Sequence, residues 1–158
     1  MRPTFTIGIE EEYQTVDPVT RDLRSHIHTE MMEQGRMRLQ ERVKAELHQA
    51  VVEVGTSVCH NIKDAKAEVK KLRHDMITLA RENGLRLASA ATHPFADWRV
   101  QEITPDERYK NIVEDMQLVA RANLIWSARP HRNRRSRDCY PVDEPCALFC
   151  AAHPGSFD

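Results

Sequence analysis

Alternating side chains near the N-terminus predict a β-strand with two unlike faces. Residues 4–15 read Thr-Phe-Thr-Ile-Gly-Ile-Glu-Glu-Glu-Tyr-Gln-Thr, a β-favouring run that carries three consecutive carboxylates. Because successive side chains of a strand point to opposite sides, Glu10 and Glu12 project together, while Glu11 shares the other face with Ile9. A solvated strand usually places single charges between apolar residues, so this cluster is the first indication of a function.

The spacing of Glu10 and Glu12 suits the binding of divalent cations. Their Cα atoms lie roughly 6 to 7 Å apart along a strand, so the two carboxylates can share hard cations, and such cations can clamp phosphate oxygens. The alternative is an exposed edge strand that carries a negative patch. The local pattern favours neither interpretation over the other.

A helical period is clearest over residues 61–83. Apolar side chains recur there at alternating three- and four-residue spacing, with Asn61 placed to cap the start and Gly84 to end the helix. The basic residues of this segment are interspersed with acids, which indicates a solvated face rather than a nucleic-acid surface. The predicted apolar stripe consists of Ile62, Ala65, Val69, Leu72, Met76 and Leu79.

A second amphipathic helix is predicted over residues 105–122. Asp106 and Glu107 lie near its N-terminus, where negative charge is favourable. The side chains expected to face inward are Tyr109, Ile112, Met116, Val119 and Ala120.

Two further strands are predicted, over residues 42–56 and 85–91. Glu53 lies in the most apolar part of the first, where a carboxylate is costly to bury unless it is paired or binds a metal. The second consists of small and apolar residues, as in strands buried on both faces. His93 follows this strand, where active-site loops tend to lie, although a structural turn histidine is equally allowed. His26, in an irregular stretch near the N-terminus, is predicted to be solvated.

The order of these elements and the composition define the class of protein. Strand, strand, long helix, strand and long helix predict an α+β fold, with an antiparallel or mixed sheet packed by two long helices. The 158 residues fit one domain or part of one, and a net charge of -1 gives no general attraction to nucleic acid or membrane. Without a signal peptide or a membrane-spanning run, we expect a cytoplasmic protein.

Four motifs resemble, in the same order, those of the ATP-dependent carboxylate-amine ligases of glutamate-cysteine ligase type 2. They are the Gly-Ile-Glu-Glu-Glu of residues 8–12, the Val-Glu-Val-Gly-Thr of 52–56, the Ala-Thr-His-Pro-Phe of 91–95 followed by Trp98, and the Glu-Arg-Tyr of 107–109. The resemblance runs from about residue 5 to residue 125. It implies a glutamine-synthetase-like catalytic fold, of which this chain would hold a part.

The resemblance also implies a chemistry. The cofactors would be ATP and Mg²⁺, and the substrates an amino-acid carboxylate and an amine, such as glutamate and cysteine. ATP would phosphorylate the carboxylate, and the amine would attack the resulting acyl phosphate. The catalytic and metal-binding residues would be Glu10, Glu12 and Glu53. No nucleic acid or membrane is implied as a partner, and a homo-oligomer is compatible with the family.

The resemblance implies roles for three further residues. Glu46 occupies the place of another acidic metal ligand, and Thr92 and His93 would line the substrate side. The position of Glu46 conflicts with strand geometry, because it lies seven residues from Glu53 and would face the opposite way in a regular strand. A bulge or a helical entry would be required to bring the two together.

The chain changes character after residue 125. Residues 127–138 are rich in arginine and lack an apolar period, and the following stretch holds three of the four cysteines. One interpretation is a non-enzymatic module that binds nucleic acid or zinc through this tail, although neither spacing is a strong signature. The zinc ligands would be Cys139, Cys146, Cys150 and His153.

A shifted reading frame explains more of the tail. If the second and third bases of each codon are joined to the first base of the next, the genetic code permits Leu-His-Val-His-Ile-Gly-Ile from residue 127. This resembles the family's His-Val-His-Val-Gly motif. We therefore expect 1–125 to be the N-terminal part of a ligase catalytic domain and 126–158 to be a frameshifted, disordered tail. The fragment would be inactive alone, and the restored histidines would complete the site.

Overall fold

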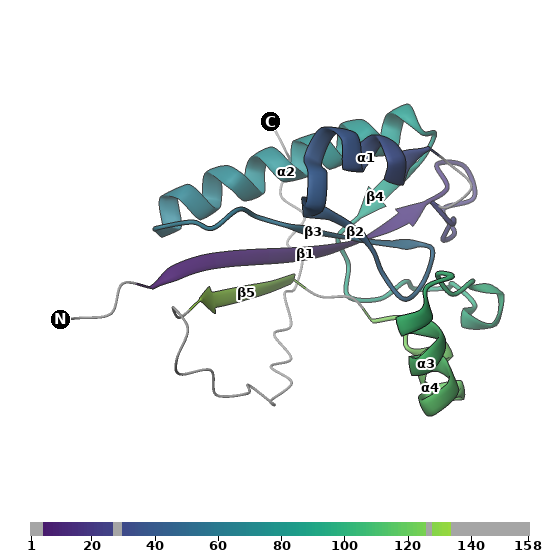
Figure 1. Ribbon diagram of the computed structural model, residues 1–158. Coiled ribbons are helices and arrows are strands. Elements are labelled where there is room, and N and C mark those ends of the chain that lie inside the picture. The colour runs from purple at the N-terminus through teal and green to yellow at the C-terminus, as the bar shows by residue number, and fades with distance from the viewer. Residues whose placement is uncertain (1–4, 27–29, 126–127, 134–158) are drawn as a thin grey trace.

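The computed structural model describes residues 5–26 and 30–125, and the backbone of residues 128–133. An antiparallel sheet is built around the long strand β1 (Thr6–Val16) (Figure 1). One edge of β1 pairs with β3 (Val51–Gly55), and β3 pairs in turn with β2 (Val43–Ala45). The predicted α+β class is confirmed, and every pairing between the strands is antiparallel.

The other edge of β1 carries two short strands. Strand β4 (Arg86–Ala88) pairs with the C-terminal end of β1, and β5 (Ala128–Asn133) pairs with its N-terminal part. Only three of the seven residues predicted for a strand at 85–91 belong to β4, and Arg86 is exposed, so that strand is not buried on both faces as expected.

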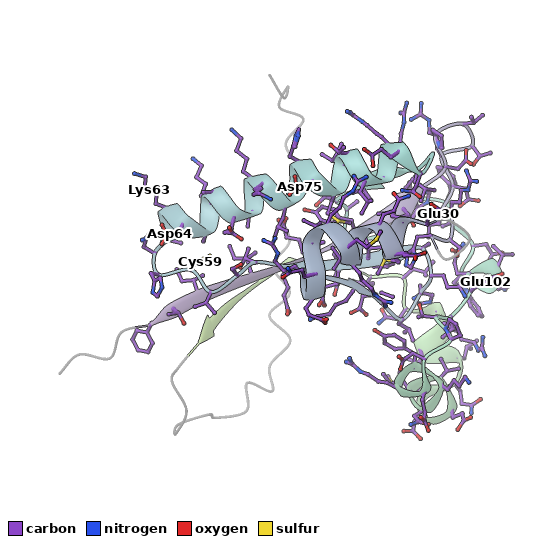
Figure 2. The ribbon with its side chains drawn as sticks, turned by 45° about the horizontal axis from the view of Figure 1, so that its top comes forward. Glu30, Cys59, Lys63, Asp64, Asp75 and Glu102 are labelled. Atoms are coloured by element: carbon purple, nitrogen blue, oxygen red, sulfur yellow. The ribbon has the colours of Figure 1, made fainter. Side chains whose placement is uncertain are left out.

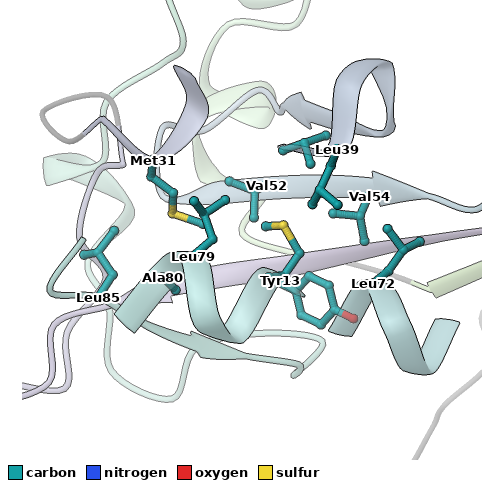
Figure 3. Close-up of a cluster of buried hydrophobic side chains, with 11 residues drawn as sticks. Tyr13, Met31, Leu39, Val52, Val54, Leu72, Leu79, Ala80 and Leu85 are labelled. Atoms are coloured by element: carbon teal, nitrogen blue, oxygen red, sulfur yellow. The ribbon is translucent and has the colours of Figure 1, made fainter. Parts of the chain in front are cut away.

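Two helices cover one face of the sheet, α1 (Met31–Leu39) and the long α2 (Ile62–Glu82) (Figure 1). A short 3₁₀ helix, η1 (Gln40–Arg42), joins α1 to β2. The core lies between the helices and the sheet (Figure 3). Its larger members are Tyr13, Val52 and Val54 from the strands, Leu72, Met76 and Leu79 from α2, and Met31 and Leu39 from α1.

Helix α2 has the predicted boundaries. The Asn61 side chain accepts a hydrogen bond from the backbone N–H of Asp64 at 3.0 Å, and Gly84 follows the helix with a φ of +68°, which glycine adopts without strain. Lys63 projects from α2 into solvent, as predicted for its polar face (Figure 2). The predicted apolar stripe is wrong at one position, because Ile62 in the first turn is 72% exposed.

The second predicted helix is broken in two. Gln117 has a φ of +52°, a left-handed conformation that ends α3 (Glu107–Met116) before α4 (Leu118–Ala122) begins. Tyr109 is buried as predicted, whereas Met116 is exposed. The sheet is therefore packed by one long helix rather than two, and a 3₁₀ helix η2 (Trp98–Val100) precedes the α3–α4 pair.

Glu11 has a structural partner on the helical face. It is 7% exposed and accepts two hydrogen bonds from the guanidinium of Arg73 on α2, one of them at 3.0 Å. The Tyr13 hydroxyl donates to the same carboxylate at 2.5 Å. Burial and the Glu11 charge raise the pKa of Tyr13 above its usual range. A charge that is costly to bury alone is thus paired, and it joins α2 to β1.

Among the described residues, His26 and His48 are the buried histidines, and the burial of His26 differs from its predicted exposure to solvent. Its Nε2 donates to the carbonyl of Val51 at 3.1 Å. His48 is 3% exposed, and its Nε2 donates to the carbonyl of Arg121 at 3.2 Å, which joins α4 to the segment between β2 and β3. Burial lowers the pKa of both imidazoles below the ordinary value of 6.5.

Part of the predicted tail is a strand. Residues 128–133 pair with β1, Ala128 opposite Glu11 and His131 opposite Gly8. The expectation of a disordered tail is therefore wrong for these six residues. Strand pairing uses backbone groups, which a segment without an apolar period still offers. The four residues proposed as zinc ligands and the rest of the tail lie outside the described residues.

We expect Met76→Ala to destabilise the chain by about 2–5 kcal/mol, because it removes a fully buried side chain from the core and leaves a cavity. Ile62→Ala is the matched control on the same helix, and its cost should stay below about 1 kcal/mol since Ile62 is largely exposed. Urea denaturation of the two variants measures the difference. Equal losses would contradict the described core.

Acid should weaken the fold through the buried histidines. A pKa lowered in the folded state contributes stability that is present above the unfolded value of 6.5 and is lost as the pH falls through the folded value. We expect the melting temperature to fall between about pH 7.5 and about pH 5.5, and to fall less in His48→Gln. His74→Gln, at an exposed position of α2, should keep the parent's pH dependence. An unchanged pH dependence in His48→Gln would contradict this role.

Candidate functional site

A row of charged side chains crosses three strands on the face opposite the helices. Lys44 of β2 lies directly opposite Glu53 of β3, and Glu53 lies directly opposite Glu12 of β1. Directly paired residues of antiparallel strands project from the same side of the sheet. The register thus brings Glu12 and Glu53 together, although they are far apart in the sequence.

Glu46 joins this row from the end of β2. Glu12, Glu46 and Glu53 each offer a carboxylate oxygen, and these oxygens all lie within 4.8 Å of one another. The predicted single strand over 42–56 is wrong, because the chain turns back between β2 and β3. This hairpin also removes the conflict over Glu46 and Glu53. The two residues lie on opposite sides of a reversal of the chain, so no bulge is needed to bring them to one face.

The three carboxylates place negative charge at high density. Burial raises the pKa of Glu46, and the neighbouring charges of Glu53 and Glu12 raise it further, while a hydrogen bond from the Leu47 N–H at 3.1 Å acts in the opposite direction. Carboxylate oxygens are hard ligands, which Mg²⁺ and Mn²⁺ prefer. This arrangement fits a divalent cation, since a cation would offset the repulsion.

Two further side chains border the carboxylates, and the sequence analysis assigned neither of them to the site. The Lys44 ammonium donates to Glu53 at 3.2 Å. The Tyr109 hydroxyl donates to the carbonyl of Ala45 at 3.0 Å, and burial together with the charge of Glu46 raises the pKa of Tyr109 to about 12. Lys44 could be found only from the β2–β3 pairing. Tyr109 could have been found from the sequence, because it is the last residue of the Glu-Arg-Tyr motif at 107–109.

Glu10 lies on the same face but outside the group of three. Its Oε1 is 4.0 Å from the Lys44 Nζ, so Lys44 approaches both Glu10 and Glu53. Glu10 pairs with Gly55, next to the Glu12–Glu53 pair. The metal role predicted for Glu10 stays a prediction, and among the described residues the observed convergence is that of Glu12, Glu46 and Glu53.

Thr92 and His93 lie in the loop after β4. The His93 Nδ1 accepts a hydrogen bond from the Ala96 N–H at 3.1 Å, and its Nε2 donates to the Arg21 carbonyl at 2.9 Å. The imidazole thereby holds this loop against the turn after β1. A substrate role for these two residues stays a prediction, and any such role of His93 must keep or replace both hydrogen bonds.

This fold and site define a class: an α+β protein with a carboxylate cluster on one face of an antiparallel sheet and helices on the other. Residues 6–139 match the family model described as glutamate-cysteine ligase family 2. The chain belongs to this family. The match extends past residue 125 and includes β5.

Several curated relatives are similar over most of this chain, and each is provisionally named glutamate-cysteine ligase 2. A protein of Solibacter usitatus is 60% identical over 138 residues, which is 87% of this chain and 36% of the relative. One of Roseiflexus castenholzii is 55% identical over 127 residues, 80% of this chain and 33% of the relative. One of Sorangium cellulosum is 48% identical over 85% of this chain and 36% of the relative. The chain thus spans about a third of the length of these relatives.

None of the helices within the described residues is long and apolar enough to cross a membrane.

We expect the 158-residue chain to bind Mn²⁺ weakly, with a dissociation constant on the order of a millimolar, because three carboxylates supply only part of a full ligand set. Glu53→Gln and Glu12→Gln should each weaken binding about tenfold. Glu41→Gln, at an exposed position of η1, should leave the affinity unchanged. Isothermal titration calorimetry measures the four affinities. Equal binding by all four proteins would show that the cluster does not hold the ion.

Proposed function

We propose that this chain is the N-terminal part of an ATP-dependent carboxylate-amine ligase with glutamate-cysteine ligase activity in its intact form. The observation that carries the proposal is the convergence of Glu12, Glu46 and Glu53 on one sheet face, within a region that belongs to this family. The names of the relatives support amino acids as substrates. ATP and the particular pair, glutamate and cysteine, are part of the proposal.

The proposed reaction has two steps, phosphorylation of a carboxylate and formation of an amide. A substrate carboxylate oxygen attacks the γ-phosphorus of ATP, the bond to the β,γ-bridging oxygen breaks, and ADP leaves. The amine of the second substrate then attacks the acyl carbon, an amide forms, inorganic phosphate leaves, and the amine loses its proton. Both steps concentrate negative charge on phosphate oxygens, so the site needs compensating positive charge.

Glu12, Glu46 and Glu53 would hold magnesium. When bound, Mg²⁺ supplies neutralisation of the phosphate charge. The chain's own contribution is positional, because Glu12 and Glu53 are fixed by the backbone pairing of β1 and β3. Glu46 is held near them by its hydrogen bond to Leu47 and by the adjacent contact between Tyr109 and Ala45. Carboxylates on a rigid sheet keep their spacing when ligands exchange.

We also propose that the reading frame changes near residue 125. In the frame proposed above, histidines would stand at positions 128 and 130. The observed register pairs these positions with Glu11 and Ile9. Directly paired residues share a face, so such histidines would lie on the side of Glu11 and away from Glu12. Our expectation that they complete the site therefore requires β5 to shift by one residue in the restored protein, since such a shift changes the face.

We expect a gene with the alternative frame restored after Ile125, and extended to its natural stop codon, to encode an active ligase. The restored protein should release ADP when given ATP, Mg²⁺, glutamate and cysteine, whereas the 158-residue chain should not. A coupled ADP assay measures this. A restored frame that soon reaches a stop codon would contradict the frame change but not the family assignment.

The same restored protein tests the site. Glu53→Gln should lower the rate of ADP release more than about a hundredfold, because one charged ligand contributes several kcal/mol to stabilising the transition state. Glu10→Gln tests the expected role of Glu10, which lies outside the group of three, and Glu41→Gln is the control. Full activity in Glu53→Gln would exclude the proposed mechanism.

A further inference from the structure

Lys44 places a positive charge beside two of the carboxylates, Glu53 and Glu10. It lies directly opposite Glu53 in the β2–β3 ladder, so the pairing of the two side chains is set by the backbone register. Its ammonium donates to a Glu53 oxygen at 3.2 Å and lies 4.0 Å from a Glu10 oxygen. The Lys44 side chain is 57% exposed, whereas that of Glu53 is 14% exposed. An exposed cation thus lies beside a mostly buried anion, in a pair set by the strand register.

We infer that Lys44 is an internal counter-ion that competes with the divalent cation for Glu53. This inference rests on the proposed metal role of the carboxylate cluster. The Lys44 ammonium uses an oxygen of Glu53 and adds a positive charge next to the position that a metal would take. An incoming cation must therefore compete with the ammonium for Glu53 and is repelled by its charge. The exposed, flexible stem lets the ammonium withdraw into water at small cost.

Two consequences follow for the site. Without a cation, Lys44 offsets part of the repulsion among carboxylates that the sheet holds together. With a divalent cation present, the doubly charged ion can displace the single charge of Lys44. A monovalent cation has no such advantage over an ammonium that is already held beside Glu53 by the chain. Lys44 thereby lowers the affinity of the site for all cations and favours divalent over monovalent ions.

Mn²⁺ titration of variants tests the inference. We expect Lys44→Met to bind Mn²⁺ about three- to tenfold more tightly than the parent, since it removes both the competitor and its charge. Lys44→Arg keeps the charge and should bind no more tightly than the parent. Lys71→Met is the matched control: Lys71 is similarly exposed and also paired, with Asp75 at 2.7 Å, but it lies on α2. Its Mn²⁺ affinity should equal that of the parent.

A second measurement separates competition from a change in folding. The rise in melting temperature on adding Mn²⁺ should be larger in Lys44→Met than in the parent, because tighter binding adds more stability at the same ion concentration. Potassium chloride at the same ionic strength should give no such rise in the parent.

The outcomes distinguish this inference from the proposed function. If the parent binds Mn²⁺ and Lys44→Met binds it equally or more weakly, the competition is wrong while the metal site stands. Weaker binding by Lys44→Met would indicate that Lys44 instead holds Glu53 in place for the metal. If none of the four proteins binds Mn²⁺, both the inference and the metal role of the cluster fail.

Discussion

The alternation of side chains along β1 is the constraint on which the rest of the structure depends. β1 pairs with strands on both of its edges, so its direction and register fix the whole sheet. The alternation sends Glu11 to the helical face and Glu12 to the other. On the helical face a carboxylate is tolerated only because Arg73 and Tyr13 bind it. On the other face Glu12 meets carboxylates from the β2–β3 hairpin.

The carboxylate charges on the two faces of the sheet are therefore offset in different ways. Glu11 is neutralised within the protein by two hydrogen bonds from the Arg73 guanidinium, which link α2 to β1. Glu12, Glu46 and Glu53 instead bring three carboxylates together, and the exposed Lys44 supplies positive charge beside Glu53. Repulsion among the three carboxylates is unfavourable for folding. A cluster of this kind is expected where a protein takes up an exchangeable cation.

The raised pKa of Glu46 makes this cost depend on pH. A carboxyl whose pKa is higher in the folded state than in the unfolded state favours folding below the unfolded value of 4.5, and this contribution is lost as the pH rises through the folded value. At neutral pH the ionised cluster thus works against the fold, whereas the buried histidines favour it. The long apolar contact between α2 and the sheet must supply the difference.

The sequence by itself determined the elements whose signals are local. The alternation of β1, the stripe and caps of α2 and the separation of Glu11 from Glu12 all follow from backbone periods of two and 3.6 residues, which neighbouring residues reveal. The family motifs likewise stand within short stretches of the chain.

Tertiary structure decided where the chain reverses and which distant residues meet. The turn between β2 and β3 has no glycine or proline to mark it, yet it sets Glu46 beside Glu53 and Lys44 opposite Glu53. Gln117 breaks a segment whose apolar pattern continues through it, and packing rather than composition buries His26. In each case the local sequence allows several conformations. The choice among them depends on pairing and burial energies that arise only when distant segments meet.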